Sequence, residues 1–394
     1  MSGAFDEGLL LSEASSVDGL TEFGDERFRE PLKILLVSLK DAPLSDLGTS
    51  LLRSQVIRSL ANLLRTHHWF SQHPEISEEV VAPAFVVVGM MRSGTTLVQR
   101  LLAQDPDTAC VFGWEAMEPA PRLGIAASQP DPRIASAERR EAQSQQYAPK
   151  LFAIHPSYAH EAEEEIMILS DVFLSHVPES YCHLPLYREW LDEQDFRPAY
   201  QHLYRTLQLL QWCKKRRGEP CARWVLKTPA HLGYLDLVEE TFPGAHLIHM
   251  HRDPRESIVS GASLNATLWQ MHQDNVDARE VGKQWLQRMA WTNHRAMQFR
   301  DQRAVTDTGV TDVVFKDALK DPLVQMKSIY AQAGVEFTAD AESAMRKWLQ
   351  QDRHSNLPRH AYTAEDFGLT EARIEEQFDS YIRRFLRQVQ APTL

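Results

Sequence analysis

The residues best suited to chemistry follow the most apolar run in the chain. Val86–Val88 leads into Gly89, and the residues that come next include Arg92, Ser93, Gly94, Thr95, Thr96 and Leu97. A buried strand, a glycine turn and a helix start in this order direct several backbone N–H groups at one point. The positive end of the helix dipole adds to them, so the pattern predicts an anion-binding loop.

This loop departs from the phosphate loop of nucleotide hydrolases at one position. Gly89, Gly94 and Thr96 match the GxxxxGK[ST] spacing, but Thr95 stands where the lysine belongs. In those enzymes the lysine binds the β- and γ-phosphates beside Mg²⁺. The cation of this loop is Arg92, whose planar fork suits a smaller terminal anion with several oxygens. A tight strand–helix turn without a ligand is the simpler alternative.

Two further apolar runs end in cations. His246–Met250 is followed by Arg252, and Pro254 suits the first turn of a helix on which Ser260 lies about two turns along. Lys227 and Thr228 follow the run Trp224–Leu226 in the same way. Open α/β sheets bind ligands at the carboxyl ends of their strands. Lys227 alone would be read as a surface charge, but beside two anion sites it is expected to face the same crevice.

These motifs resemble those of the sulfotransferases that use 3′-phosphoadenosine-5′-phosphosulfate (PAPS), and most closely a bacterial branch of that family. The run Arg92–Leu97 is similar to the family's loop for the 5′-phosphosulfate, and Arg252 with Ser260 to its motif for the 3′-phosphate. The C-terminal segment from His360 is also similar, and Arg359 beside it is a further candidate for nucleotide binding. The resemblance implies PAPS as co-substrate, its desulfated form PAP as product, and no metal.

The resemblance runs from about residue 84 to the C-terminus and leaves residues 1–80 uncovered. Where the family often has Tyr-Glu-Asp-Leu, this chain has Phe315-Lys-Asp-Ala. That segment is structural in the family, so the difference puts little in doubt.

Sulfuryl transfer is an in-line displacement, which needs alignment, charge at the leaving oxygen, and a base for the acceptor hydroxyl. Arg92, Thr95 and Lys227 are expected to supply the first two, with Lys227 at the bridging oxygen. Related enzymes with this loop carry a catalytic glutamate at about the distance of Glu115, which is the preferred base. The alternative is a structural Glu115 that pairs, for instance, with Arg122.

Histidine is the competing base, because it titrates near neutral pH. His155 and His160 stand before an acidic run, residues 161–165, that is most simply a helix N-terminus or a solvated face. An apolar acceptor pocket would draw on aromatic side chains, and the candidates are Trp114, Tyr158, Phe173 and Trp269.

The elements that would position these residues alternate between short apolar runs and helical patterns, with a weaker fourth strand at Val313–Phe315. This order is typical of strand–helix units on a parallel sheet. We therefore predict an α/β, P-loop-like three-layer fold with a central parallel sheet flanked by helices and a helical N-terminal extension. The expected domains are a helical cap at 1–80 and a sulfotransferase domain at 81–394, with a helical acceptor-side insertion at 119–220.

Composition narrows the function classes. Lys and Arg number 42 against 54 Asp and Glu, so the 394-residue chain carries a net charge of −12 and is a poor nucleic-acid binder. Its 4 cysteines show no metal or disulfide spacing, and neither a signal peptide nor a membrane span is visible. We expect a cytoplasmic enzyme that acts on a small molecule, and the sequence leaves its acceptor and its oligomeric state open.

The predicted reaction moves a sulfuryl group from PAPS to a hydroxyl, or less readily to an amine. Two rival functions remain. A P-loop kinase would depend on Mg²⁺ and lacks its loop lysine here. A non-catalytic nucleotide-binding module would have no need of Arg92, Lys227, Arg252 and Ser260 together.

Overall fold

A computed structural model describes residues 3–125, 129–303, 309–351 and 362–387. Its centre is a parallel sheet with the strand order β2-β3-β1-β4-β5. The strands are β1 (Pro83–Gly89), β2 (Thr108–Ala109), β3 (Arg223–Lys227), β4 (His246–His251) and β5 (Val310–Val314). The sequence predicts all of them except the two-residue β2. The predicted fourth strand, Val313–Phe315, is displaced toward the C-terminus, because β5 already begins at Val310 and Phe315 begins a helix.

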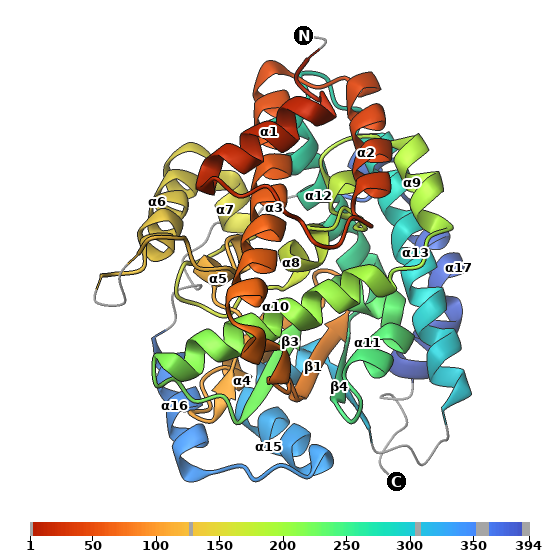
Figure 1. The fold of residues 1–394 in the computed structure, drawn as a ribbon. Helices are drawn as coiled ribbons and strands as arrows, with labels where there is room; N and C mark the ends of the chain where they lie inside the picture. Colours follow the sequence, from red (N-terminus) through yellow and green to blue (C-terminus); the bar gives the residue numbers. More distant parts are fainter. Residues whose placement is uncertain (1–2, 126–128, 304–308, 352–361, 388–394) are drawn as a thin grey trace, which may run out of the picture.

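Helices cover both faces of this sheet (Figure 1). Along β1, Phe85 and Val87 face one core, which they share with α4 (Thr95–Leu102), α15 (Pro322–Ala333) and α16 (Ala339–Gln350). Val86 and Val88 face the other and larger core. Its helices include α10 (Arg197–Arg216), α11 (Leu235–Thr241), α12 (Pro254–His272), α13 (Ala278–Gln302) and α17 (Glu371–Tyr381). The predicted three-layer α/β architecture is therefore confirmed.

The strand register brings the predicted motifs to one edge of the sheet. Gly89 at the end of β1 pairs with Met250 of β4, and Val87 pairs with Lys227 of β3. Because the strands are parallel, the loop after β1, the end of β3 and the residues after β4 all lie at the carboxyl edge.

The described part of the first eighty residues is mostly helical and belongs to the larger core. They form α1 (Glu7–Asp18), α2 (Arg29–Asp41), α3 (Asp46–Gln72) and the 3₁₀ turn η1 (Pro74–Glu78). The start of α3 docks on the end of α12, where the backbone N–H of Ser45 donates to the carbonyl of His272 at 2.9 Å. Gly48 is required there, since a Cβ would come within 2.0 Å of that carbonyl oxygen.

The segment between β2 and β3 is mainly helical. It contains α5 (Gly113–Met117), α6 (Pro132–Tyr147), α7 (Pro149–Ile154), α8 (Ile166–Ser170), the 3₁₀ turn η2 (Val177–Ser180) and α9 (Pro185–Asp192). The other elements are η3 (Pro229–Tyr234), α14 (Phe315–Lys320), η4 (Glu365–Phe367) and a π turn at Ile382–Leu386.

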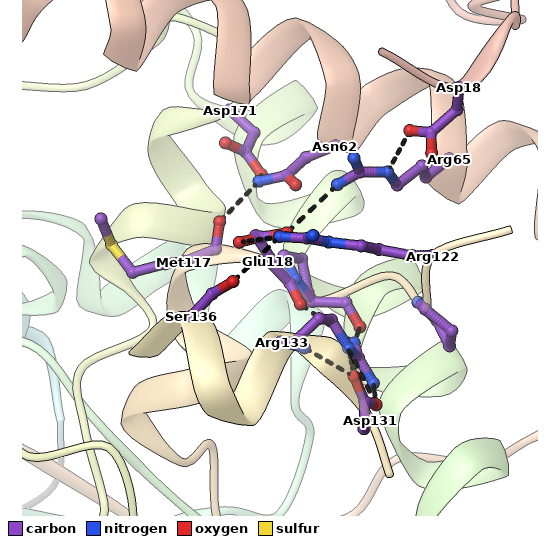
Figure 2. Close-up of polar contacts among 12 residues, drawn as sticks. Asp18, Asn62, Arg65, Met117, Glu118, Arg122, Asp131, Arg133, Ser136 and Asp171 are labelled. Atoms are coloured by element: carbon purple, nitrogen blue, oxygen red, sulfur yellow. Dashed lines mark hydrogen bonds and ion pairs between the residues drawn. The ribbon is translucent and has the colours of Figure 1, made fainter. Parts of the chain in front are cut away.

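Buried ion pairs connect this segment to the N-terminal helices (Figure 2). Arg65 of α3 pairs with Asp18 of α1 and lies 3.6 Å from the carboxylate of Glu118. Arg122 binds the same carboxylate at 2.7 Å, and Arg133 donates to the Glu118 carbonyl at 3.0 Å. Although burial opposes ionisation, Arg122, Arg140 and Arg65 hold the pKa of Glu118 below its usual value. The network fixes the loop after α5 against α3.

Candidate active site

The loop after β1 has the backbone of an anion site. Arg92 has a φ of 70° and Gly94 a φ of 90°, and α4 begins directly afterwards at Thr95. A left-handed arginine is strained, and such strain is concentrated at functional sites. Gly94 also lies under an aromatic ring, because a Cβ there would come within 2.5 Å of Phe315. The hydroxyl of Ser93 is buried and has no hydrogen-bond partner among the described residues, as expected where a ligand oxygen would bind.

Arg92 reaches across the loop to α12. Its Nε donates to the Ser260 hydroxyl at 3.1 Å, and one terminal nitrogen donates to the carbonyl of Ile154 at 2.8 Å. Burial, together with the nearby Arg252 charge, lowers the pKa of Arg92. The structure thus joins the two predicted motifs directly, because the loop arginine touches the serine of the second motif.

Arg252, the residue after β4, contacts the same loop. It donates to the carbonyl oxygen of Arg92 at 2.8 Å and to the carboxylate of Glu256 at 3.0 Å. The Phe315 ring centroid is 4.5 Å from the Arg252 guanidinium. Phe315 therefore contacts both anion motifs, although we interpreted its segment from the sequence as only structural. The signal in the sequence was that Phe315-Lys-Asp-Ala differs from the family's Tyr-Glu-Asp-Leu.

Lys227 is buried at the end of β3 and points toward the loop. Its Nζ lies 3.3 Å from the Thr96 hydroxyl and 2.6 Å from a carboxylate oxygen of Glu164. The side chains of Lys227 and Glu164 are 1% and 13% exposed, so the pair is largely shielded from water. Thr228 also donates to Glu164, at 3.4 Å. Lys227 is therefore not the surface charge of the simpler alternative.

Glu164 and Glu165 were not singled out by the sequence. Of the two interpretations of residues 161–165, the solvated face is wrong for both residues, whereas the helix N-terminus is confirmed, because α8 begins at Ile166 directly after Glu165. Glu165 is completely buried and accepts from the backbone N–H of Lys227 at 3.1 Å. Its other oxygen lies 2.7 Å from His231 Nε2, and His231 Nδ1 lies 2.9 Å from the Tyr200 hydroxyl. These partners draw the run inward, ahead of α8.

Glu115 lies in a buried ion pair on another side of β3. Its carboxylate binds Lys214 Nζ at 2.8 Å and Arg217 at 3.1 Å, and it accepts from the backbone N–H of Phe112. Its side chain is 0% exposed. These contacts favour the structural alternative for Glu115. The partner expected there differs, because Arg122 pairs with Glu118 instead.

The other expected residues divide between the crevice and the surface. His160 is exposed and paired with Glu138 at 2.9 Å, so the structure does not bring it to the strand ends. His155 follows Ile154, whose carbonyl binds Arg92. Arg359 lies outside the described residues.

The four expected pocket aromatics also separate. Trp269 lines a cavity near the crevice, whereas Phe173 lines a different one. Trp114 is stacked under Arg133, and Tyr158 packs on Phe152. Trp269 is therefore the one of these four residues that lies at a cavity near the crevice, and the acceptor pocket itself stays a prediction.

Among the described residues, three side chains of the kinds that bind metal ions lie together on β4 and β5. Atoms of His249, His251 and Asp312 lie within 4.8 Å of one another. A guanidinium nitrogen of Arg300 lies 2.7 Å from Asp312 and 3.2 Å from His249. This cation already neutralises the carboxylate, so the group is an ion-pair network.

Comparison with known proteins defines the class. Residues 83–339 match the model of the sulfotransferase family, and the chain belongs to that family. It is 27% identical to the sulfotransferase STF1 from Mycobacterium tuberculosis H37Rv, with a TM-score of 0.82 over 95% of this chain and 98% of that one. It is 25% identical to STF9 from Mycobacterium avium, with a TM-score of 0.85 over 96% of both.

A curated relative adds an activity. The omega-hydroxy-beta-dihydromenaquinone-9 sulfotransferase Stf3 of Mycobacterium bovis is 23% identical over 321 residues, which cover 78% of this chain and 77% of that protein. The present chain is thus an enzyme of sulfuryl transfer. None of the helices in its described part combines the length and apolar character that a bilayer crossing requires.

Proposed function

We propose that the enzyme transfers a sulfuryl group from PAPS to a hydroxyl of a small-molecule acceptor. The observation that carries this proposal is the convergence of Arg92, Lys227 and Arg252 from three adjacent strand ends. The Mycobacterium bovis relative is named for sulfuryl transfer to an omega-hydroxy compound, which supports a hydroxyl rather than an amine acceptor.

The donor's two anionic groups fit the two motifs. Arg252 and Ser260 would hold the 3′-phosphate, since both lie beside the left-handed turn at Arg92. The backbone N–H groups at the start of α4 and the unpartnered Ser93 hydroxyl would hold the 5′-phosphosulfate. Phe315 would keep the Arg252 guanidinium in place through its ring face.

Transfer needs a cation at the leaving oxygen and a base at the acceptor, and one ion pair supplies both. Lys227 would stabilise negative charge on the bridging oxygen. Glu164, 2.6 Å from it, would accept the proton of the acceptor hydroxyl. We propose Glu164 for this role in place of Glu115, because its partner Lys227 touches Thr96 of the anion loop, whereas Glu115 is bound by Lys214 and Arg217 at the end of α10.

The rival functions make different demands on this site. A kinase would need a cation at the position of Thr95, whereas Lys227 reaches the neighbouring Thr96 from another strand. A binding module without catalysis would have no use for a shielded acid–base pair beside the loop. We further propose a cytoplasmic location, since all four cysteines are free thiols and burial raises the pKa of Cys110 and Cys182 to about 12.

Calorimetry with two nucleotides tests the assignment. Arg252→Ala should weaken PAP binding by roughly ten- to a hundredfold, the value of a charge-assisted bond, and leave adenosine 5′-phosphosulfate almost unaffected. Arg255→Ala is the matched control, because Arg255 lies three residues further on, in the first turn of α12, and pairs with Asp253 and Glu375. Equal losses for both nucleotides would overturn the assignment of the 3′-phosphate to Arg252.

A further inference from the structure

A cavity of about 80 Å³ adjoins the candidate active site. Four of its lining residues lie close in the chain to catalytic or nucleotide-binding candidates or share a helix with them. Met91 precedes Arg92, Ile166 follows the Glu164–Glu165 pair, Pro229 follows Thr228, and Asn265 shares α12 with Ser260. A molecule in this cavity would therefore lie next to the proposed base and the loop.

The walls of the cavity are mostly aromatic and aliphatic. Trp269 comes from α12, Trp285 and Trp291 from α13, and Tyr234 from the end of η3. Val177, Val281 and Met289 complete the apolar lining. Val177 belongs to η2, within the segment 119–220 expected on the acceptor side. Such walls gain free energy by burying carbon rather than hydroxyl groups.

The charged groups in the wall neutralise one another. The Glu179 carboxylate binds Arg288 at 2.9 Å and His176 at 2.8 Å. Burial opposes its ionisation, but the bond to His176 and the arginine charges lower the pKa of Glu179 to about 2. Arg288 also binds Asp192 at 2.6 Å. The Arg288 charge is thus compensated by protein carboxylates and offers little to an anionic ligand.

Several hydrogen-bonding groups of the wall are occupied, although the buried indole N–H of Trp285 has no partner among the described residues. His176 Nε2 lies 2.8 Å from the Tyr234 hydroxyl. The indole N–H of Trp269 and the amide of Gln284 both donate to the backbone carbonyl of Glu179, at 3.1 and 2.9 Å. A sugar bound here could replace few of its bonds to water, since the Trp285 N–H would satisfy one hydroxyl at most, and each further buried hydroxyl is costly.

We propose that this cavity is the acceptor subsite and that it selects an uncharged alcohol whose carbons beside the hydroxyl are apolar. This inference rests on the proposed function. A cavity of about 80 Å³ is smaller than the ~150 Å³ cavity that holds benzene. It therefore encloses the first carbons beside the hydroxyl of an alkyl or prenyl chain, and the rest of the acceptor extends out of the cavity. Sugars and acceptors with a charge near the hydroxyl are excluded.

Three acceptors with six carbons each test the chemistry: hexanol, hydroxyhexanoate and glucose. Their binding to the full-length enzyme with PAP is followed by tryptophan fluorescence, because three tryptophans line the cavity. PAP formation from PAPS gives kcat and KM. Hexanol should bind and react at least tenfold better than the other two. Equal or better use of glucose or hydroxyhexanoate would overturn the inference.

Two substitutions test the place. Val281→Phe fills the cavity and should raise the KM for hexanol roughly tenfold with PAP affinity unchanged, in line with the effect of a misfitted methylene group. Met289→Ala enlarges it and should shift the preference toward branched alcohols, which keeps the test valid if Val281→Phe folds poorly. Val324→Phe, on the exposed face of α15, is the matched control.

The outcomes separate the two proposals. If both variants keep wild-type KM values while PAP still binds and PAPS still reacts, the acceptor lies elsewhere and the proposed function stands. If neither PAP binds nor PAPS reacts in the wild type, the proposed function has failed, and the acceptor subsite with it.

Discussion

Lys227 and Glu164 form an ion pair of 2.6 Å at the end of β3, although 63 residues separate them in the sequence. Lys227 also touches Thr96 of the anion loop. The pair therefore places one cation and one carboxylate where the leaving oxygen and the acceptor hydroxyl would meet. A shielded pair of this kind interacts more strongly than it would in water.

Replacing Glu164 tests the base. Glu164→Gln keeps the shape of the side chain and removes its basicity, so turnover should fall by about 10²–10⁴ with PAP affinity little changed. The acid limb of the pH–rate profile should move or disappear. His155→Ala and His160→Ala serve as comparisons. Near-normal turnover in Glu164→Gln beside an inactive histidine variant would move the base to that histidine.

Replacing Glu115 should act on stability instead. Glu115→Gln leaves Lys214 as a buried cation without its main partner, which typically costs about 3–5 kcal/mol. Urea denaturation should show that loss, while kcat of the folded fraction stays within a few-fold of the wild type. A stable Glu115→Gln enzyme without turnover would return the catalytic role to Glu115.

Arg92 should matter more for turnover than for product binding. If it contacts the transferring group, Arg92→Ala lowers kcat more than it lowers PAP affinity, because PAP lacks the sulfuryl group. Steady-state kinetics and calorimetry on the same preparation measure both effects. Equal losses would mean that Arg92 acts with Ser260 at the 3′-phosphate, as their 3.1 Å contact also allows.

Acid should weaken the wall of the proposed acceptor cavity. The folded-state pKa of Glu179 is lowered from 4.5 to about 2, so its stabilising effect is complete above pH 5 and is lost as the pH falls toward 2. The shift corresponds to about 3 kcal/mol. Urea midpoints between pH 3 and pH 7 should decline more in the wild type than in Glu179→Gln. Parallel curves would show that Glu179 is not held ionised by His176 and Arg288.

The parts of the site that the sequence predicted are local in the chain. The loop from Gly89 to Thr96 and the step from Arg252 to Ser260 each lie within one strand–turn–helix unit, where spacing determines geometry. Short apolar runs likewise identified four of the five strands. β2 was missed because two residues, Thr108 and Ala109, carry no periodic pattern.

The parts that the sequence missed depend on distant partners. Nothing in the run Glu161–Glu165 distinguishes Glu164 from its neighbours, since its role follows from Lys227, which the sheet brings beside it. The pairing of Glu115 could not be predicted for the same reason, because its partner Lys214 lies 99 residues further on. Local motifs therefore predicted residues that meet at the strand ends, tertiary contacts determine the other neighbours of this crevice, and the donor and acceptor roles stay predictions.

Comparing the wild type with Lys227→Met tests whether Lys227 drives sulfuryl transfer. Conversion of PAPS to PAP is measured for both enzymes with hexanol and a metal chelator present. The wild type should form PAP and hexyl sulfate without a divalent cation. Lys227→Met should still bind PAP but transfer about 10²–10³ times more slowly, the usual cost of one lost charge-stabilising group. Equal rates for the two enzymes, or transfer that appears only with ATP and Mg²⁺, would contradict the account.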